Sequence, residues 1–195
     1  MRILAISGSL RDDSYNTALL RALREEAPEG VEVDIWQGLK VIPPYDQDDD
    51  VVPGPEAVEA FRELVRESDA VFFATPEYNS SIPGALKNAL DWGSRPVATN
   101  VFRNKPVAVI SASAGAFGGV WAGAELRKVL GAMGARVTEA ELAVGHAHEK
   151  VDEDGSLYDV VAHGDAGRAA GEVREGLRDA LQTLVTGVLD RAAAA

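Results

Sequence analysis

The chain of 195 residues contains no cysteine, which excludes disulfides, thiolate metal ligands and cysteine nucleophiles. This composition fits a cytoplasmic protein. No apolar run approaches the roughly 18 residues of a membrane-spanning helix, so no membrane partner is expected. Basic residues are outnumbered by acidic ones, and the formal net charge is −12. Since nucleic-acid binding needs a basic face, no nucleic-acid partner is expected, and an anionic ligand would depend on local dipoles.

Apolar segments of two kinds alternate along the chain. Strand-like runs occupy residues 2–7, 31–36, 70–75, 106–113 and 136–143. Helix-like spacing follows at residues 15–26, 55–69, from Pro83 onward, 121–133 and 169–192. This alternation predicts a doubly wound three-layer α/β/α fold with a parallel sheet, in one domain over residues 1–195. Residues from about 190 are expected to form a frayed tail.

Three loops with unusual chemistry follow predicted strands, at residues 8–16, 76–83 and 114–119. In parallel α/β sheets, ligands bind beyond the carboxyl ends of the strands. All three loops therefore open on the same edge of the sheet, which is where we expect a ligand.

The first loop, GSLRDDSYN (8–16), has neither the G-x-x-x-x-G-K-[ST] nor the G-x-G-x-x-G fingerprint of nucleotide-binding proteins. It nevertheless places hydroxyls, an amide and Arg11 at a helix start, where the helix dipole favours a phosphate. No lysine follows to reach further phosphates, so a monophosphate is favoured over a triphosphate. Asp12 and Asp13 are expected to face solvent. The alternative is that Ser14 or Asn16 only caps the helix.

The second loop, TPEYNSSIPG (75–84), is stiffened by two prolines and carries adjacent donors at Tyr78, Asn79 and Ser80. A flat heterocycle fits against such a loop. The alternative is a turn in which Tyr78 fills a surface groove.

The third loop, SAGAFGG (113–119), allows a ligand close to the backbone because Gly115, Gly118 and Gly119 lack a Cβ atom. The alternative is a tight strand-to-helix connection. A phosphate site, a wall for a planar ring and a glycine-rich floor together suggest flavin mononucleotide (FMN).

Four segments carry a resemblance to the NADPH-dependent FMN reductase family: GSLRDDSYNT, VIPPYDQD, TPEYNSSIPGALKNALDWGSRP and SASAGAFGG. This flavodoxin-like family includes quinone, azo-dye and chromate reductases. The resemblance covers about the first 145 residues, and VDEDGSLYD near residue 155 is also similar. It implies a flavodoxin-like sandwich with a five-stranded parallel sheet in the order 2-1-3-4-5.

The resemblance also implies which residues contact FMN. The family's phosphate loop is matched by Ser9, Arg11, Ser14, Asn16 and Thr17. Its loop beside the isoalloxazine ring is matched by Pro76, Glu77, Tyr78, Asn79 and Ser80. Its second ring-contacting loop is matched by Ser113, Gly115, Gly118 and Gly119.

The implied activity is that of an FMN-dependent NAD(P)H oxidoreductase. Hydride would pass from NADPH or NADH to flavin N5, and then in a ping-pong scheme to a quinone, azo compound, metal oxyanion or free flavin. The flavin carries the chemistry, so no catalytic side chain and no metal is expected. The alternative is a non-enzymatic, flavodoxin-like electron carrier.

The resemblance further implies a homodimer or homotetramer with the flavin near the subunit interface. The helix carrying Asp91 and Trp92 is expected near that interface, with an ordinary core position as the alternative for Trp92. The physiological acceptor, the choice between NADH and NADPH, and the tightness of FMN binding stay open at this stage.

Overall fold

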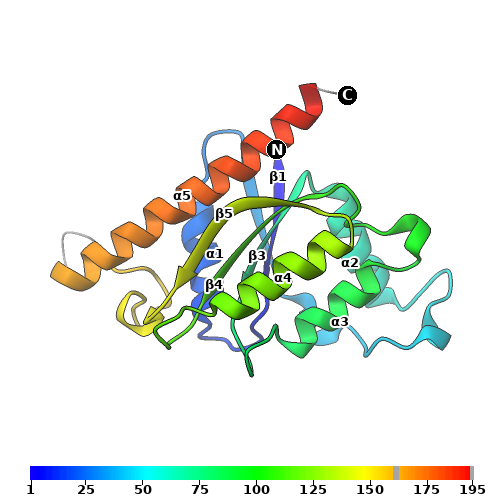
Figure 1. Ribbon diagram of the computed structural model, residues 1–195, viewed down its shortest axis with the longest axis horizontal. Helices are drawn as coiled ribbons and strands as arrows, with labels where there is room; N and C mark the ends of the chain where they lie inside the picture. The colour runs from blue at the N-terminus through cyan, green and yellow to red at the C-terminus, as the bar shows by residue number, and fades with distance from the viewer. Residues whose placement is uncertain (160–162, 194–195) are drawn as a thin grey trace.

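Five parallel strands form one sheet in the order β2-β1-β3-β4-β5. The computed structural model describes residues 1–159 and 163–193. The strands are β1 (Arg2–Ser7), β2 (Glu32–Trp36), β3 (Ala70–Thr75), β4 (Pro106–Ala112) and β5 (Arg136–Val144). Both the predicted fold class and the predicted strand order are confirmed. The N-terminus starts β1 at the top of Figure 1, so the carboxyl edge of the sheet is at the bottom of that view.

Helices cover both faces of the sheet, as Figure 1 shows. The five α-helices of the described residues are α1 (Tyr15–Glu25), α2 (Glu56–Glu67), α3 (Gly84–Gly93), α4 (Val120–Ala132) and α5 (Gly164–Ala193). Four short 3-10 helices lie between them: η1 (Gly38–Val41), η2 (Gln47–Asp49), η3 (Val97–Thr99) and η4 (Ala147–Glu149). Residues of α1 and α5 pack on one face of the sheet, and residues of α2, α3 and α4 pack on the other.

The central strand β3 is buried along its whole length because helices cover it on both sides. Its side chains alternate between the two layers. Phe72 belongs to the core under α1 and α5, while Phe73 belongs to the core under α2, α3 and α4. The continuous apolar run AVFFAT in the sequence is the consequence of this two-sided burial.

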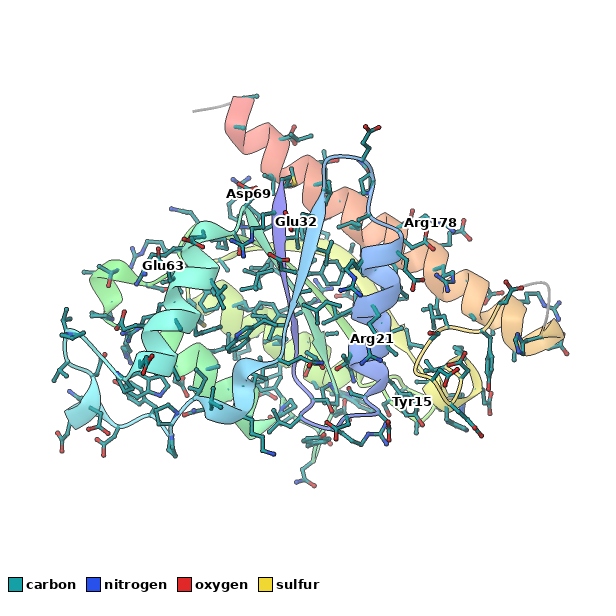
Figure 2. All side chains as sticks on the ribbon, turned by 180° about the vertical axis from the view of Figure 1, so that it is seen from behind. Tyr15, Arg21, Glu32, Glu63, Asp69 and Arg178 are labelled. Carbon is teal, nitrogen blue, oxygen red and sulfur yellow. The ribbon has the colours of Figure 1, made fainter. Side chains whose placement is uncertain are left out.

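Helix α5 begins at Gly164, five residues before the predicted start, and continues to Ala193. Residues 190–193 of the expected tail are therefore helical, and residues 194–195 lie outside the described part. Arg174 and Arg178 of α5 bond to the carboxylate of Glu26 after α1, and Figure 2 labels Arg178 on α5 beside α1. The bond from Arg178 lowers the pKa of Glu26. No described helix has the apolar stretch needed to cross a membrane.

The edge strand β5 contains an irregularity that Arg127 of α4 fills. Val107 pairs with Val137 and Val109 pairs with Glu141, so β5 carries two extra residues between these pairs. The Arg127 guanidinium donates to the Val109 and Thr138 carbonyl oxygens at 2.7 Å, and also to the carbonyl of Ala140. Burial lowers the pKa of Arg127. One side chain thus donates to three backbone carbonyls at this irregularity.

Replacing Arg127 with methionine should lower the free energy of unfolding by about 2–4 kcal/mol, because buried carbonyls lose a charged donor while the side-chain volume stays similar. Urea denaturation measures this change. The matched control is Lys128→Met on the same helix, where the side chain is exposed, and its unfolding midpoint should hardly move. Equal midpoints for the two variants would show that Arg127 does not support the irregular part of β5.

Candidate functional site

The three loops meet at the carboxyl edge of the sheet and are joined by specific contacts. The backbone N–H of Gly8 donates to the carbonyl of Ala74 at 2.8 Å. A Cβ atom on Gly8 would lie 3.0 Å from Leu86 Cδ2 and 3.2 Å from Pro76 Cδ. The first loop therefore packs directly on the second, and glycine at this position keeps them close.

Asn16 connects the first loop to the end of β4. Its side-chain Nδ2 donates to the Ala112 carbonyl, and its Oδ1 accepts from the Ala112 N–H, each at 3.0 Å. The side chain is buried. The amide that was expected to contact phosphate is thus used to position the loop.

Ser14 is the N-cap of α1, as the alternative interpretation of this loop proposed. Its Oγ accepts from the Thr17 N–H at 3.3 Å, and Thr17 Oγ1 donates to Ser7 Oγ at 2.9 Å. The N–H groups of Tyr15 and Asn16, in the first turn, have no intrahelical acceptor. The cap therefore orients a helix start whose positive end points to the carboxyl edge.

Arg11 lies exposed on the first loop. Its guanidinium donates to the Asp13 carbonyl and lies over the Tyr15 ring, 5.0 Å from the ring centroid. Its backbone N–H donates to Ser9 Oγ at 3.3 Å. Asp12 and Asp13 are exposed, as predicted.

A cavity of about 280 Å³ opens beside this loop, and sequence reasoning missed two of its cations. Arg21 comes from the second turn of α1, and Lys40 comes from η1 after β2. Figure 2 labels Tyr15 and Arg21 on α1. The full lining is Ser7, Ser9, Leu10, Arg11, Asp12, Thr17, Arg21, Gln37, Leu39 and Lys40. Three cations thus face one cavity in a chain of net charge −12.

The sequence contained a signal for Arg21, which lies four residues after Thr17 and hence on the same face of α1. Lys40 gave no such signal. Its position depends on how the loop after β2 folds back toward β1, and no local pattern reports that path.

The second loop turns at Asn79 and Ser80. The backbones of Tyr78 and Ser81 bond to each other in both directions, at 3.0 and 3.2 Å. Asn79 and Ser80 have φ angles of 53° and 60°. Two left-handed central residues define a type I′ turn, in which asparagine is favoured over most side chains. The turn projects the Tyr78 side chain into solvent with 52% of it exposed.

Glu77 holds the second loop to the third. Its Oε2 accepts from the Trp121 and Ala122 N–H groups, each at 3.1 Å. These groups belong to the first turn of α4, whose N-cap is Gly119 and supplies no side-chain acceptor. A carboxylate at a helix N-terminus also interacts favourably with the helix dipole. Glu77 is therefore a cap supplied from another loop, a role that the sequence did not reveal.

The third loop packs on the end of β5 through glycine contacts. A Cβ atom on Gly118, where φ is 62°, would lie 2.7 Å from the backbone of residues 143–145. A Cβ atom on Gly145 would lie 2.2 Å from the Ala116 carbonyl oxygen. Ser113 Oγ accepts from the Gly115 N–H at 2.9 Å. Gly118 and Gly145 are thus required for packing. Gly118 was among the residues predicted for the site, whereas Gly145 was not.

The chain matches the family model described as NADPH-dependent FMN reductase over residues 1–149. The chain belongs to the NADPH-dependent FMN reductase family. It is 41% identical to an NAD(P)H-dependent FMN reductase of Pseudomonas aeruginosa over 160 residues, which is 82% of this chain and 85% of the relative. It is 38% identical to a quinone reductase of Escherichia coli over 162 residues, 82% of this chain and 86% of the relative.

Among solved structures, the flavoenzyme NAD(P)H:(acceptor) oxidoreductase FerB from Paracoccus denitrificans matches with a TM-score of 0.81 and 30% identity. The match covers 95% of this chain and 98% of FerB. These findings confirm an oxidoreductase that uses FMN with NAD(P)H. The alternative of a non-enzymatic electron carrier is not favoured, because the relatives are named as enzymes.

Two segments that carry the family resemblance contact each other in the structure. Asn88 Nδ2 and Trp92 Nε1 both donate to the Pro43 carbonyl at 2.8 Å, and Asn88 Oδ1 accepts from the Tyr45 N–H at 2.7 Å. Trp92 is fully buried within this chain. The core alternative for the Trp92 side chain is correct, and the position of this helix near a subunit interface stays a prediction. Asp91 instead pairs with Lys87 on the helix surface.

Replacing Glu77 with alanine should lower the free energy of unfolding by about 1–2 kcal/mol, because two N–H groups of α4 lose their acceptor. Urea denaturation followed by circular dichroism measures the effect. Glu77→Gln retains an acceptor oxygen and should recover part of the loss, while Glu29→Ala, an exposed carboxylate before β2, serves as control. A Glu77→Ala variant as stable as the Glu29→Ala variant would contradict the capping role.

Proposed function

We propose that the three loops bind one FMN and use it to pass electrons from NAD(P)H to a small planar acceptor of the quinone class. The observation that carries this proposal is the cationic cavity at the start of α1, joined by Gly8 and Asn16 to the loops after β3 and β4. It supports a ligand with an anionic end and a body lying toward β3 and β4.

The donor set at the cavity fits the phosphate of FMN. Arg11, Arg21 and Lys40 supply positive charge, and Ser9 and Thr17 supply hydroxyls. Charge-assisted bonds to phosphate oxygens are the strong class of hydrogen bond, and Arg11 offers a planar fork for them. Ser14 and Asn16 keep the loop and helix start in place rather than contact the phosphate with their side chains.

The residues proposed beside the ring are Pro76–Ser80 and the backbone of Ser113, Gly115 and Gly119. Pro76 is buried and Glu77 is fixed by its bonds to α4, so this wall is rigid. A rigid wall limits the cost of ordering a bound ring.

When bound, FMN supplies the hydride-accepting ring and holds two electrons between donor and acceptor. Ping-pong exchange of nicotinamide and acceptor over one ring face is the kinetic scheme that we propose. The chain's own residues orient the ring and screen one side of it. None of them is required as a nucleophile or metal ligand.

We further propose that the chain forms a homodimer or homotetramer, as expected from the family resemblance, and acts in the cytoplasm. Light scattering of the purified protein tests the assembly directly. A monomer at micromolar concentration would contradict this part of the proposal and leave the flavin chemistry untouched.

The protein should purify yellow or turn yellow with added FMN, and NADPH or NADH should bleach it under anaerobic conditions. Addition of a quinone should then restore the flavin absorbance. Stopped-flow spectroscopy of the two half-reactions measures this. A protein that binds no FMN, or whose flavin neither nucleotide reduces, would contradict the proposed function.

Replacing Arg11 or Lys40 with alanine should weaken FMN binding by about tenfold each, because one charged contact to phosphate is worth on the order of 1.4 kcal/mol. Fluorescence titration of the apoprotein with FMN measures the dissociation constant. Riboflavin, which lacks the phosphate, should bind both variants and the parent protein equally. The matched control is Lys128→Ala on the exposed side of α4. Equal FMN affinity in the parent protein and all three variants would show that the phosphate does not bind in this cavity.

A further inference from the structure

Exposed aromatic side chains are confined to one small region of the surface. The chain has three tryptophans, four tyrosines and five phenylalanines, and all of them lie in the described residues. Only Tyr78, Phe117 and Trp121 are more than half exposed, at 52%, 67% and 52%. Tyr78 and Phe117 belong to the loops after β3 and β4, and Trp121 to the first turn of α4, beside the residues that we place along the flavin ring.

These three side chains are held by the contacts that join the two loops. The Phe117 and Trp121 rings meet edge to face with their centroids 5.1 Å apart. The Trp121 N–H is bound by Glu77, the residue before Tyr78. A Cβ atom on Gly119 would lie 3.5 Å from the Glu77 Cβ atom. The backbones that carry the aromatic groups are therefore fixed relative to each other.

We propose that Tyr78, Phe117 and Trp121 form a stacking platform that binds the planar acceptor and sets the acceptor specificity of the enzyme. The proposal rests on the proposed function, because it needs a reducible ring beside these loops. Aromatic pairs stabilise a contact by about 0.5–1.5 kcal/mol beyond the burial of their area. A platform of rings without charged groups favours an extended, neutral, flat molecule over a small or charged one.

The redox balance requires nothing from the platform itself. NAD(P)H gives a hydride, which is two electrons and one proton, and solvent supplies a second proton. The quinone carbonyls become the two hydroxyls of a hydroquinone. The aromatic side chains orient the acceptor and exclude water from one of its faces, and they form no bond to it.

The size of the apolar region favours a small molecule over a second copy of the chain. Tyr78, Phe117, Val120 and Trp121 are its large exposed apolar residues. A standard protein–protein interface needs roughly 20–30 residues and about 800 Å² on each partner. Four side chains, on the two loops and the first turn of α4, are far fewer than such an interface needs, which favours a small fused-ring acceptor.

The test compares Phe117→Ala, Trp121→Ala and their double variant with the parent protein, each loaded with FMN. The acceptors are 1,4-naphthoquinone, 1,4-benzoquinone and ferricyanide, which is charged and not planar. The KM for naphthoquinone should rise roughly three- to tenfold in each single variant, following the energy of one aromatic contact. Benzoquinone should be affected less, and ferricyanide not at all. Trp121→Phe keeps an aromatic ring, so its KM for naphthoquinone should stay close to that of the parent protein.

Two readouts separate the platform from other roles. The affinity for FMN and the rate of flavin reduction at saturating NADPH should stay unchanged in all variants, because the nicotinamide, which exchanges with the acceptor over the same ring face, can change only in its affinity. Leu189→Ala removes an equally exposed apolar side chain from α5 (57% exposed) and should leave every acceptor unaffected.

An unchanged KM for naphthoquinone in the double variant would overturn the proposal. So would a uniform loss for all three acceptors together with slower flavin reduction, which would indicate a structural role. A smaller particle mass by light scattering in the variants would assign the surface to contact between copies instead. If NADPH does not reduce the flavin of the parent protein, the proposed function fails and the platform fails with it. If the flavin is reduced but the variants do not discriminate between acceptors, only the platform is overturned.

Discussion

The bond between Glu77 and the first turn of α4 determines how the two loops of the ring region lie relative to each other. A parallel sheet brings the ends of β3 and β4 to one edge, but it does not fix the loops that follow. The Glu77 carboxylate does so by accepting two N–H groups of α4, where the N-cap Gly119 has no acceptor to offer. Gly118 and Gly145 then allow the third loop to lie against the end of β5. The bond thereby places Trp121 and the neighbouring Phe117 beside the loop that carries Tyr78.

The fold was largely predictable from local patterns. β3 is found where the run AVFFAT predicted it because burial on both faces requires apolar side chains along a central strand, with polar Thr75 only at its end. The helix starts near Pro55 and Pro83 were predicted because proline fixes its own φ angle and suits the beginning of a helix. The start of α5 was missed by five residues. The irregularity in β5 was not predicted, because it depends on Arg127 reaching it from another element.

The site was predictable as a set of loops but not as a set of contacts. The loop after β1 follows its strand locally, so its position at the carboxyl edge could be inferred. The partner of Asn16 is Ala112, 96 residues away, and the partners of Glu77 are 44 and 45 residues away. Residue type alone does not distinguish an amide that binds a ligand from one that holds a loop. The core position of Trp92 could not be chosen over its alternative for the same reason, since its bond to Pro43 closes a long loop that sequence spacing does not describe.

Charged and aromatic groups occupy different ends of the site along the carboxyl edge of the sheet. Arg11, Arg21 and Lys40 surround the cavity at the start of α1, in a chain whose overall field repels anions. Tyr78 and Phe117 lie on the loops beyond β3 and β4, and Trp121 lies in the first turn of α4. Since β1 lies next to β3 in the sheet and β3 next to β4, the cationic and aromatic ends follow each other along one edge. A ligand with a charged phosphate at one end and a flat apolar ring at the other matches this order in one orientation only. The reverse orientation would place the phosphate among exposed aromatic rings and away from the cavity where three cations outnumber the carboxylate of Asp12, so the polarity of the edge supports the orientation that we propose for the cofactor.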